Sequence, residues 1–219
     1  MKILALEFSA QLRSVAIATA EVTGETNLLS SVEDADFRGV TGLMLIDRAL
    51  SQAKRTPADI THIAVGLGPG SYTGIRAAIA IAQGWQLGRG VQLIGTSSVE
   101  CLAEQAREAG FQGAVSVIVD AQREDIYLAR YDLPPERVSL ITPLAIVKPQ
   151  TVDLSELIIG PEVKRFFPNA PKAHPLSPSA AMLARLAARS TNFLPGEQLE
   201  PIYLRATTFV KAAPARQIE

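Results

Sequence analysis

The stretch Gly66-Leu67-Gly68-Pro69-Gly70-Ser71-Tyr72-Thr73-Gly74-Ile75-Arg76 decides the fold prediction for this chain. Its first two residues end a short run, 61–67, in which Ile63 and Val65 alternate with smaller or polar residues as in a strand. Its last residues belong to a run with helical spacing, 72–87. A glycine-rich turn between a strand and a helix is typical of an open α/β sheet, and such sheets place their ligand sites at this position.

The residues of this loop allow two interpretations. Glycines permit positive φ angles and close backbone approach, Ser71 and Thr73 can cap the helix, and free N–H groups at its start can receive an anion. The loop matches neither Gly-x-x-x-x-Gly-Lys-Ser/Thr nor Gly-x-Gly-x-x-Gly, because Ser71 or Thr73 falls where the third glycine should be. The sequence therefore leaves two interpretations equally open: a loop that binds phosphate, or a tight turn that caps a helix.

Outward from the loop, each half of the chain predicts a similar order of elements. The strands expected in the first half are 3–9, 14–19, 28–32, 61–67 and 91–95, and the helices are 40–53, 72–87 and one opened by the capping box Ser97-Ser98-Val99-Glu100. An acidic loop is expected over 33–36. The strands expected in the second half are 114–119, 125–131, 138–147 and 157–160, followed by a helix starting at Ser177-Pro178.

This order predicts an α/β fold of two lobes related by duplication, with mixed sheets and a reduced second lobe. The expected boundary assigns residues 1–97 to the first lobe and 98–219 to the second. The 219 residues are 47% hydrophobic and 20% charged, with a formal net charge of −1, so the chain has no strong grip of its own on nucleic acid phosphates. The single Cys101 excludes an internal disulfide and is expected as a buried structural thiol in a cytoplasmic protein.

The loop resembles the signature of the TsaB family, also called the YeaZ family. Its string Gly68-Pro69-Gly70-Ser71-Tyr72-Thr73-Gly74-Ile75-Arg76 is the specific part of the resemblance. Weaker matches follow in the family's order at 3–9 with 14–16, 95–100, 119–127 and 201–205. The resemblance implies a two-lobed actin-like and sugar-kinase-like (ribonuclease-H-like) fold, and a role in adding threonylcarbamoyl to an adenosine of tRNAs that read codons beginning with A.

The resemblance also implies partners. Family members pair with a metal-bearing catalytic paralogue, TsaD, through first-lobe helices, an ATPase, TsaE, joins them, and tRNA is contacted through the complex; homodimers use the same surface. No membrane partner is expected. The corresponding helices are 40–53 and 72–87, and the expected interface residues are Leu43, Ile46, Leu50, Ile75, Ile79, Ala82 and Trp85. The alternative is that both faces of these helices serve the chain's own core.

The chain has few residues of the types and spacing that a catalytic site of its own would need. The paralogue binds its metal with two histidines four apart, whereas His62 and His174 stand alone, so no metal site is expected. Superfamily kinases place an aspartate at the end of the first strand, where this chain has Glu7-Phe8-Ser9. Asp120 could supply that acid in the second lobe, or it belongs to a solvated charged turn, 120–125.

The expected role is therefore a non-catalytic subunit without a tightly bound cofactor. ATP or ADP at the partner interface is left open, with Gly68 to Gly74 and Arg76 as the candidate contacts. The main alternative is an autonomous nucleotide hydrolase or kinase using Glu7 or Asp120. A peptidase is disfavoured because His-Glu-x-x-His and Gly-x-Ser-x-Gly are absent, and an RNA-binding module because no basic-aromatic cluster occurs.

Overall fold

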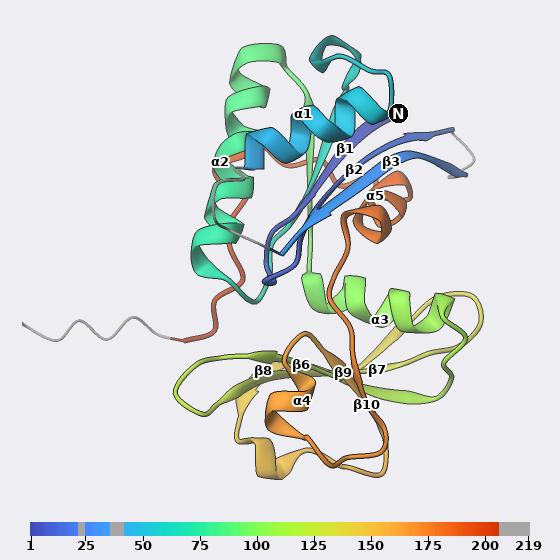
Figure 1. Ribbon diagram of the computed structural model, residues 1–219, viewed down its shortest axis with the longest axis vertical. Coiled ribbons are helices and arrows are strands. Elements are labelled where there is room, and N and C mark those ends of the chain that lie inside the picture. The colour runs from blue at the N-terminus through green and yellow to red at the C-terminus, as the bar shows by residue number, and fades with distance from the viewer. Residues whose placement is uncertain (22–24, 36–41, 206–219) are drawn as a thin grey trace, which may run out of the picture.

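The computed structural model describes residues 1–21, 25–35 and 42–205, and in this part of the chain the strands form two five-stranded sheets (Figure 1). The first sheet contains β1 (Lys2–Glu7), β2 (Arg13–Ala20), β3 (Thr26–Asp34), β4 (His62–Gly66) and β5 (Gln92–Thr96). The second contains β6 (Ala114–Asp120), β7 (Ile126–Asp132), β8 (Ser139–Val147), β9 (Leu157–Gly160) and β10 (Ala173–Pro175).

The two sheets have the same topology. Their strand orders are β3-β2-β1-β4-β5 and β8-β7-β6-β9-β10. In each, the first three strands form an antiparallel meander and the last two run parallel to the central strand. This confirms the predicted duplication. The second lobe is reduced as expected, since α4 (Val163–Phe166) has 4 residues where its counterpart α2 (Tyr72–Arg89) has 18.

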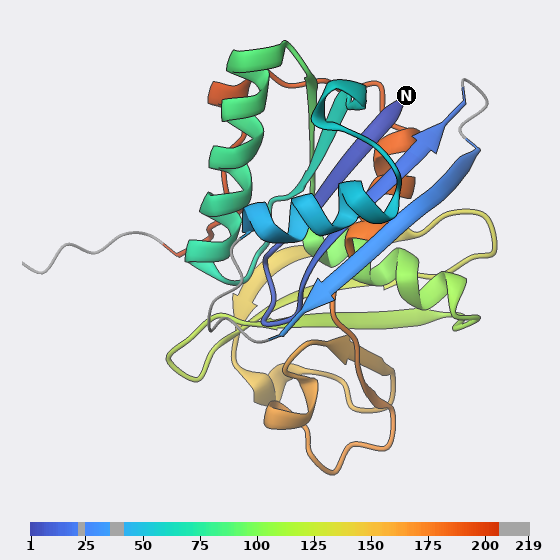
Figure 2. The ribbon, with the colours of Figure 1, turned by 45° about the horizontal axis from the view of Figure 1, so that its top comes forward.

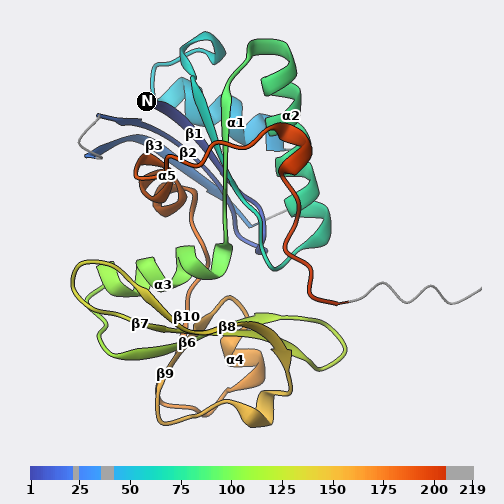
Figure 3. The ribbon, with the colours of Figure 1, turned by 180° about the vertical axis from the view of Figure 1, so that it is seen from behind.

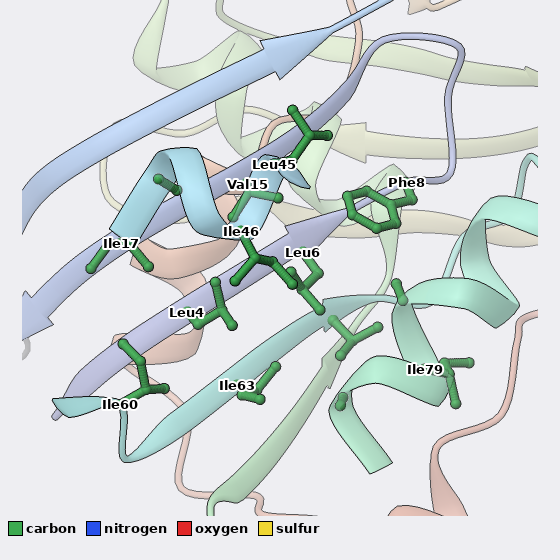
Figure 4. Close-up of a cluster of buried hydrophobic side chains, with 14 of the residues drawn as sticks. Leu4, Leu6, Phe8, Val15, Ile17, Leu45, Ile46, Ile60, Ile63 and Ile79 are labelled. Atoms are coloured by element: carbon green, nitrogen blue, oxygen red, sulfur yellow. The ribbon is translucent and has the colours of Figure 1, made fainter. Parts of the chain in front are cut away.

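Helices cover both faces of the first sheet. The helices α1 (Gly42–Gln52) and α2 lie on one face, and α5 (Ala180–Ala188) lies on the other (Figures 1 and 2). Successive strand residues point to opposite faces, so Leu4 and Leu6 pack under α1 and α2, in the cluster that Figure 4 draws, while Ile3 and Ala5 pack against α5. None of the helices in the described residues is long and apolar enough to cross a membrane.

The two lobes exchange helices. The helix α3 (Ser98–Glu108) follows the first sheet but packs its Leu102 and Ala106 on the second, against Val115 and Val117. The helix α5 follows the second sheet but packs on the first. Both helices therefore lie between the sheets (Figure 3). The predicted boundary at 97/98 falls between β5 and α3, and the chain from residue 180 onward returns to the first lobe.

Several local predictions need correction. Ser97 occupies the N-cap position of α3, but its side chain makes no capping hydrogen bond, so the predicted box does not form. The last helix is capped by Ser179, whose Oγ accepts a hydrogen bond from the Met182 amide at 3.3 Å, and not by Ser177. Residues 33 and 34 of the expected acidic loop belong to β3. The sequence does not predict the short strand β10. Residue 36 of that loop and residues 40–41 of the expected helix 40–53 lie outside the described residues. The described part also contains three short 3₁₀ helices, η1 (Pro57–Asp59), η2 (Pro149–Thr151) and η3 (Gly196–Gln198).

Two glycines of α2 make a matched test of this packing. A Cβ at Gly74 would lie 2.0 Å from the Phe8 carbonyl oxygen, whereas a Cβ at Gly84 would meet nothing within 4 Å. Gly74→Ala should therefore lower the free energy of unfolding by about 1–3 kcal/mol through overpacking. Gly84→Ala should raise it by about 0.5–1 kcal/mol, because alanine restricts the unfolded chain and favours helix. Urea denaturation of both variants measures the difference, and equal effects would contradict the packing described here.

Candidate functional site

The glycine loop closes on the connection between β1 and β2. The Ser71 amide donates a hydrogen bond to the Ser9 carbonyl oxygen at 2.6 Å, and a Cβ at Gly70 would lie 2.1 Å from the same oxygen. Gly70 has φ +148° and Gly68 has φ +87°, so glycine suits both positions. The close backbone approach expected of these glycines is therefore made to the chain itself.

The loop also starts α2. Ser71 Oγ accepts a hydrogen bond from the Gly74 amide at 3.3 Å, which confirms the predicted serine cap, whereas Thr73 lies exposed in the first turn. Pro69 is buried and follows a cis peptide bond. Arg76 donates a hydrogen bond to Tyr72 Oη at 2.5 Å, with its guanidinium 5.1 Å from the centre of the Tyr72 ring. The side chains of Ser71 and Arg76 thus both have partners within α2 and its cap.

Glu7 lies beneath the loop with no exposed surface. Its Oε1 accepts a hydrogen bond from the Ser9 amide and its Oε2 accepts one from Ser98 Oγ, both at 2.9 Å. Gly66 makes room for this carboxyl, since a Cβ there would lie 2.1 Å from Oε2. Burial raises the pKa of Glu7, and the hydrogen bonds from Ser9 and Ser98 oppose that rise. The Glu7 carboxyl, at the end of β1, therefore supports the glycine loop from its buried side.

Cys101 lies in α3 and is fully buried. Burial raises the pKa of its thiol well above the ordinary value, and the negative charge of Glu7 adds to that rise. A thiol held neutral in this way is a poor nucleophile, and the prediction that Cys101 is buried is confirmed.

The corresponding acid of the second lobe, Asp120, belongs to a salt-bridged turn. Its Oδ1 accepts a hydrogen bond from the Gln122 amide at 2.7 Å, and its Oδ2 accepts one from Arg165 at 2.5 Å. The three residues 122–124 have positive φ angles, and Arg123 and Glu124 are exposed. The charged turn proposed from the sequence is therefore present, and its first residue, Asp120, pairs with Arg165 of α4.

The two histidines lie in different lobes. His62 is on β4 with its ring centre 5.6 Å from that of Phe193, and His174 is on β10 with its ring centre 5.3 Å from that of Phe111. Across residues 1–21, 25–35 and 42–205, no group of three or more His, Cys, Asp or Glu side chains is arranged to hold a metal ion.

Most of the side chains predicted to contact a partner instead form the core of the first lobe. These buried residues, at most 6% exposed, are Ile46, Leu50, Ile75, Ile79 and Ala82. Figure 4 draws Ile46 beside Leu4 and Leu6 of the central strand. Trp85 is half-buried against the same core, and only Leu43 is well exposed, at 58%. The apolar stripes of both helices face the sheet, so the core alternative is correct for these five residues.

The outward side of the same helices carries a different set of residues. We call them the outer face: Leu43, Met44, Ala80, Gly84, Leu87 and Gly88, all exposed. The start of α1 lies beside the middle of α2, since a Cβ at Gly42 would lie 3.2 Å from Ile81 Cδ1 (Figure 2). Leu87 is 90% exposed, and a Cβ at Gly84 or Gly88 would meet nothing within 4 Å. The i, i+4, i+8 spacing of Ala80, Gly84 and Gly88 could have revealed this face from the sequence.

The enclosure of Glu7 predicts a specific pH dependence. Because its pKa is raised in the folded chain, the native state binds the proton more tightly, and stability falls as pH rises from the unfolded pKa to the folded one. Glu7→Gln keeps an oxygen that can accept from Ser9 but does not ionise. Its stability relative to the parent chain should rise over that pH range, by about 1.4 kcal/mol per unit of pKa shift, and then level off.

Urea denaturation across about pH 4 to 8 measures this difference. Glu33→Gln, at an exposed position of β3, serves as the control for the loss of one negative charge. A stability difference for Glu7→Gln that is the same at every pH would show that the carboxyl is not enclosed as described.

Comparison with known proteins gives the family. The family model described as TsaD, tRNA N6-adenosine threonylcarbamoyltransferase, matches residues 41–193. The chain is 35% identical over 89 residues to the tRNA threonylcarbamoyladenosine biosynthesis protein TsaB of Escherichia coli strain K12, covering 41% of this chain and 38% of that one. It is 33% identical over 92 residues to TsaB of Bacillus subtilis strain 168, covering 42% and 39%. The chain thus spans about two fifths of the length of the curated relatives it matches.

A solved structure extends the likeness over most of the chain. The structure of YeaZ from Pseudomonas aeruginosa superposes with a TM-score of 0.78 at 25% identity, and covers 93% of this chain and 99% of that one. The family model, the TsaB relatives and the shared two-lobed fold agree with the glycine loop at residues 66–76. The chain therefore belongs to the TsaB (YeaZ) family of the TsaD-type tRNA threonylcarbamoyltransferase proteins.

Proposed function

We propose that this chain acts in tRNA threonylcarbamoyladenosine biosynthesis as a non-catalytic subunit that binds a TsaD-like paralogue through the outer face. The names of the TsaB relatives support the pathway. The observation that carries the subunit role is the outer face, where α2 exposes Leu87 together with two glycines, Gly84 and Gly88. In this proposal a TsaE-like ATPase joins the pair, tRNA is contacted through the complex, and any ATP or ADP lies at the junction with the paralogue.

The two glycines of the outer face lower the stability of the isolated chain. Gly84 and Gly88 lie inside α2, where glycine is less stable than alanine by about 0.5–1 kcal/mol per residue. No close approach within the described chain requires them, because a Cβ at either position would be in open space. Small residues let two helices pack at short interaxial distance. A partner helix resting on Gly84 and Gly88 would bury Leu87 and account for the glycines.

The acids that an autonomous enzyme would use are already bound within the chain. Glu7 has no exposed surface and both of its carboxyl oxygens accept hydrogen bonds, and Asp120 pairs with Arg165. A nucleotide hydrolase or kinase needs a carboxylate that can reach its ligand or metal. The alternative function would therefore require Glu7 to leave its enclosure, which supports the partner role over the enzyme role.

The outer face can be tested with two matched leucines. Leu87→Glu places a charge on the outer face, whereas Leu154→Glu makes the same change at a 50% exposed position of the second lobe. After co-expression with the paralogue, Leu87→Glu should weaken the complex at least about tenfold, equivalent to about 1.4 kcal/mol. Leu154→Glu should leave it unchanged. Size-exclusion chromatography measures the complex, a tRNA modification assay measures its activity, and circular dichroism checks that both variants fold.

Two results would contradict the proposal. One is full binding and modification activity with Leu87→Glu. The other is ATP turnover by the chain alone that disappears in Glu7→Gln while the oligomeric state stays the same, which would favour the autonomous enzyme.

A further inference from the structure

The segment after α5 runs along the free edge of the first sheet. The Leu194 amide donates a hydrogen bond to the Leu93 carbonyl oxygen of β5 at 2.9 Å. At Gly196, the carbonyl oxygen accepts from Gln83 Nε2 at 2.8 Å and the amide donates to Gln86 Oε1 at 2.7 Å, which ties the segment to α2. Figure 3 shows this segment passing along α2 toward the second lobe. Residues 194–196 are thus bound to the first lobe by hydrogen bonds to β5 and α2.

Residues 200–205, which we call the strap, then pass over the glycine loop. The Ile202 amide donates a hydrogen bond to the Leu67 carbonyl oxygen at 2.9 Å, directly after the end of β4. The Tyr203 ring stacks on the Tyr72 ring, with ring centres 5.1 Å apart and planes inclined by 27°. A backbone hydrogen bond and an aromatic stack therefore fix the strap to the first lobe immediately before it reaches the second.

The last residue of the strap contacts the second lobe. The Arg205 guanidinium donates to the Ala121 carbonyl oxygen at 3.2 Å, to the Gln122 carbonyl oxygen at 3.4 Å and to Asp125 Oδ2 at 2.9 Å. These acceptors all lie in the turn that follows β6. All three contacts are made by one nitrogen, Nη2, and the contact with Asp125 is the strongest because it pairs a cation with a carboxylate. Lys148 Nζ lies 2.7 Å from Asp125 Oδ1 and leaves Oδ2 for Arg205.

The strap makes a third connection between the lobes, beside the crossing at residue 97, where the Gly68 carbonyl oxygen accepts a hydrogen bond from the Ser98 amide at 2.8 Å. Among the described residues, the chain also crosses between the lobes at residue 97, between β5 and α3, and at 176–179, between β10 and α5. Those crossings lead directly into the two helices that lie between the sheets. The strap instead joins the loops at the carboxyl ends of β4 and β6, one from each lobe. Separation of these two loops would have to break the contacts of Arg205.

We infer that the strap is a latch that fixes the angle between the two lobes through Arg205. With the latch closed, the strap adds to the connections made through α3 and α5, and together they hold the sheets in one relative orientation. With Arg205 released, the lobes can rotate about the two helices, and the glycine loop is free to move away from the 121–125 turn. This inference concerns the isolated chain and does not depend on the proposed function.

The latch can be tested by distance measurement in the full chain. Spin labels at Gln52→Cys in α1 and Gln150→Cys in η2 report on the two lobes from exposed positions, and Cys101 is buried and should not take up label. Pulsed electron spin resonance should give a narrow distance distribution for the parent chain. Arg205→Ala should broaden it or add longer distances. Arg89→Ala, an exposed arginine at the end of α2, is the matched control and should leave it narrow.

A second variant and a salt series separate the latch from a folding defect. Asp125→Asn keeps an acceptor but removes the charge, so its distribution should lie between those of the parent chain and Arg205→Ala. Raising the salt from about 0.1 M to about 1 M should move the parent distribution toward that of Arg205→Ala, because screening weakens partly exposed ion pairs. Identical distributions for the parent chain, Arg205→Ala and the double variant Tyr203→Ala/Arg205→Ala would overturn the inference.

Discussion

The arrangement of the first lobe depends on the contact between the glycine loop and the connection from β1 to β2. Backbone meets backbone there, at positions where a Cβ on Gly70 or Gly74 would collide with a carbonyl oxygen. The Glu7 carboxyl fills the space beneath, held by Ser9 and Ser98. This contact fixes where α2 begins, and hence which side of α2 packs on the sheet and which side forms the outer face. It also supplies the Leu67 and Tyr72 contacts on which the strap rests.

Duplication explains the shared topology of the two sheets, but the acid at the end of the first strand has different surroundings in the two lobes. The acid at the end of the first strand is enclosed in one lobe, as Glu7, and ion-paired in the other, as Asp120. The exchange of α3 and α5 makes each sheet rely on a helix that follows the other one in sequence. In both lobes, groups of the chain itself bind the acid at the end of the first strand.

Part of this structure could be predicted from the sequence. The glycine loop identified the strand-turn-helix unit, the order of apolar runs indicated the duplication, and the surroundings of Cys101 indicated a buried thiol. The orientation of α2 could not be predicted, because its alanines and glycines give a weak amphipathic pattern, and Ile75 and Ile79 were assigned to the wrong side. The enclosure of Glu7 and the contacts of Arg205 join residues about 90 and 80 positions apart, which no local pattern encodes. The short strand β10 carries too few residues for a period to be read.

In the complex that we propose, the paralogue covers the outer face. The most direct measurement is the maleimide reactivity of a single exposed thiol, Ala80→Cys, with and without the paralogue, since the native Cys101 is buried. We expect the reaction of this thiol to slow at least about tenfold in the complex, because a partner helix on Gly84 and Gly88 would exclude the reagent. An unchanged rate in a complex that still co-elutes would contradict it.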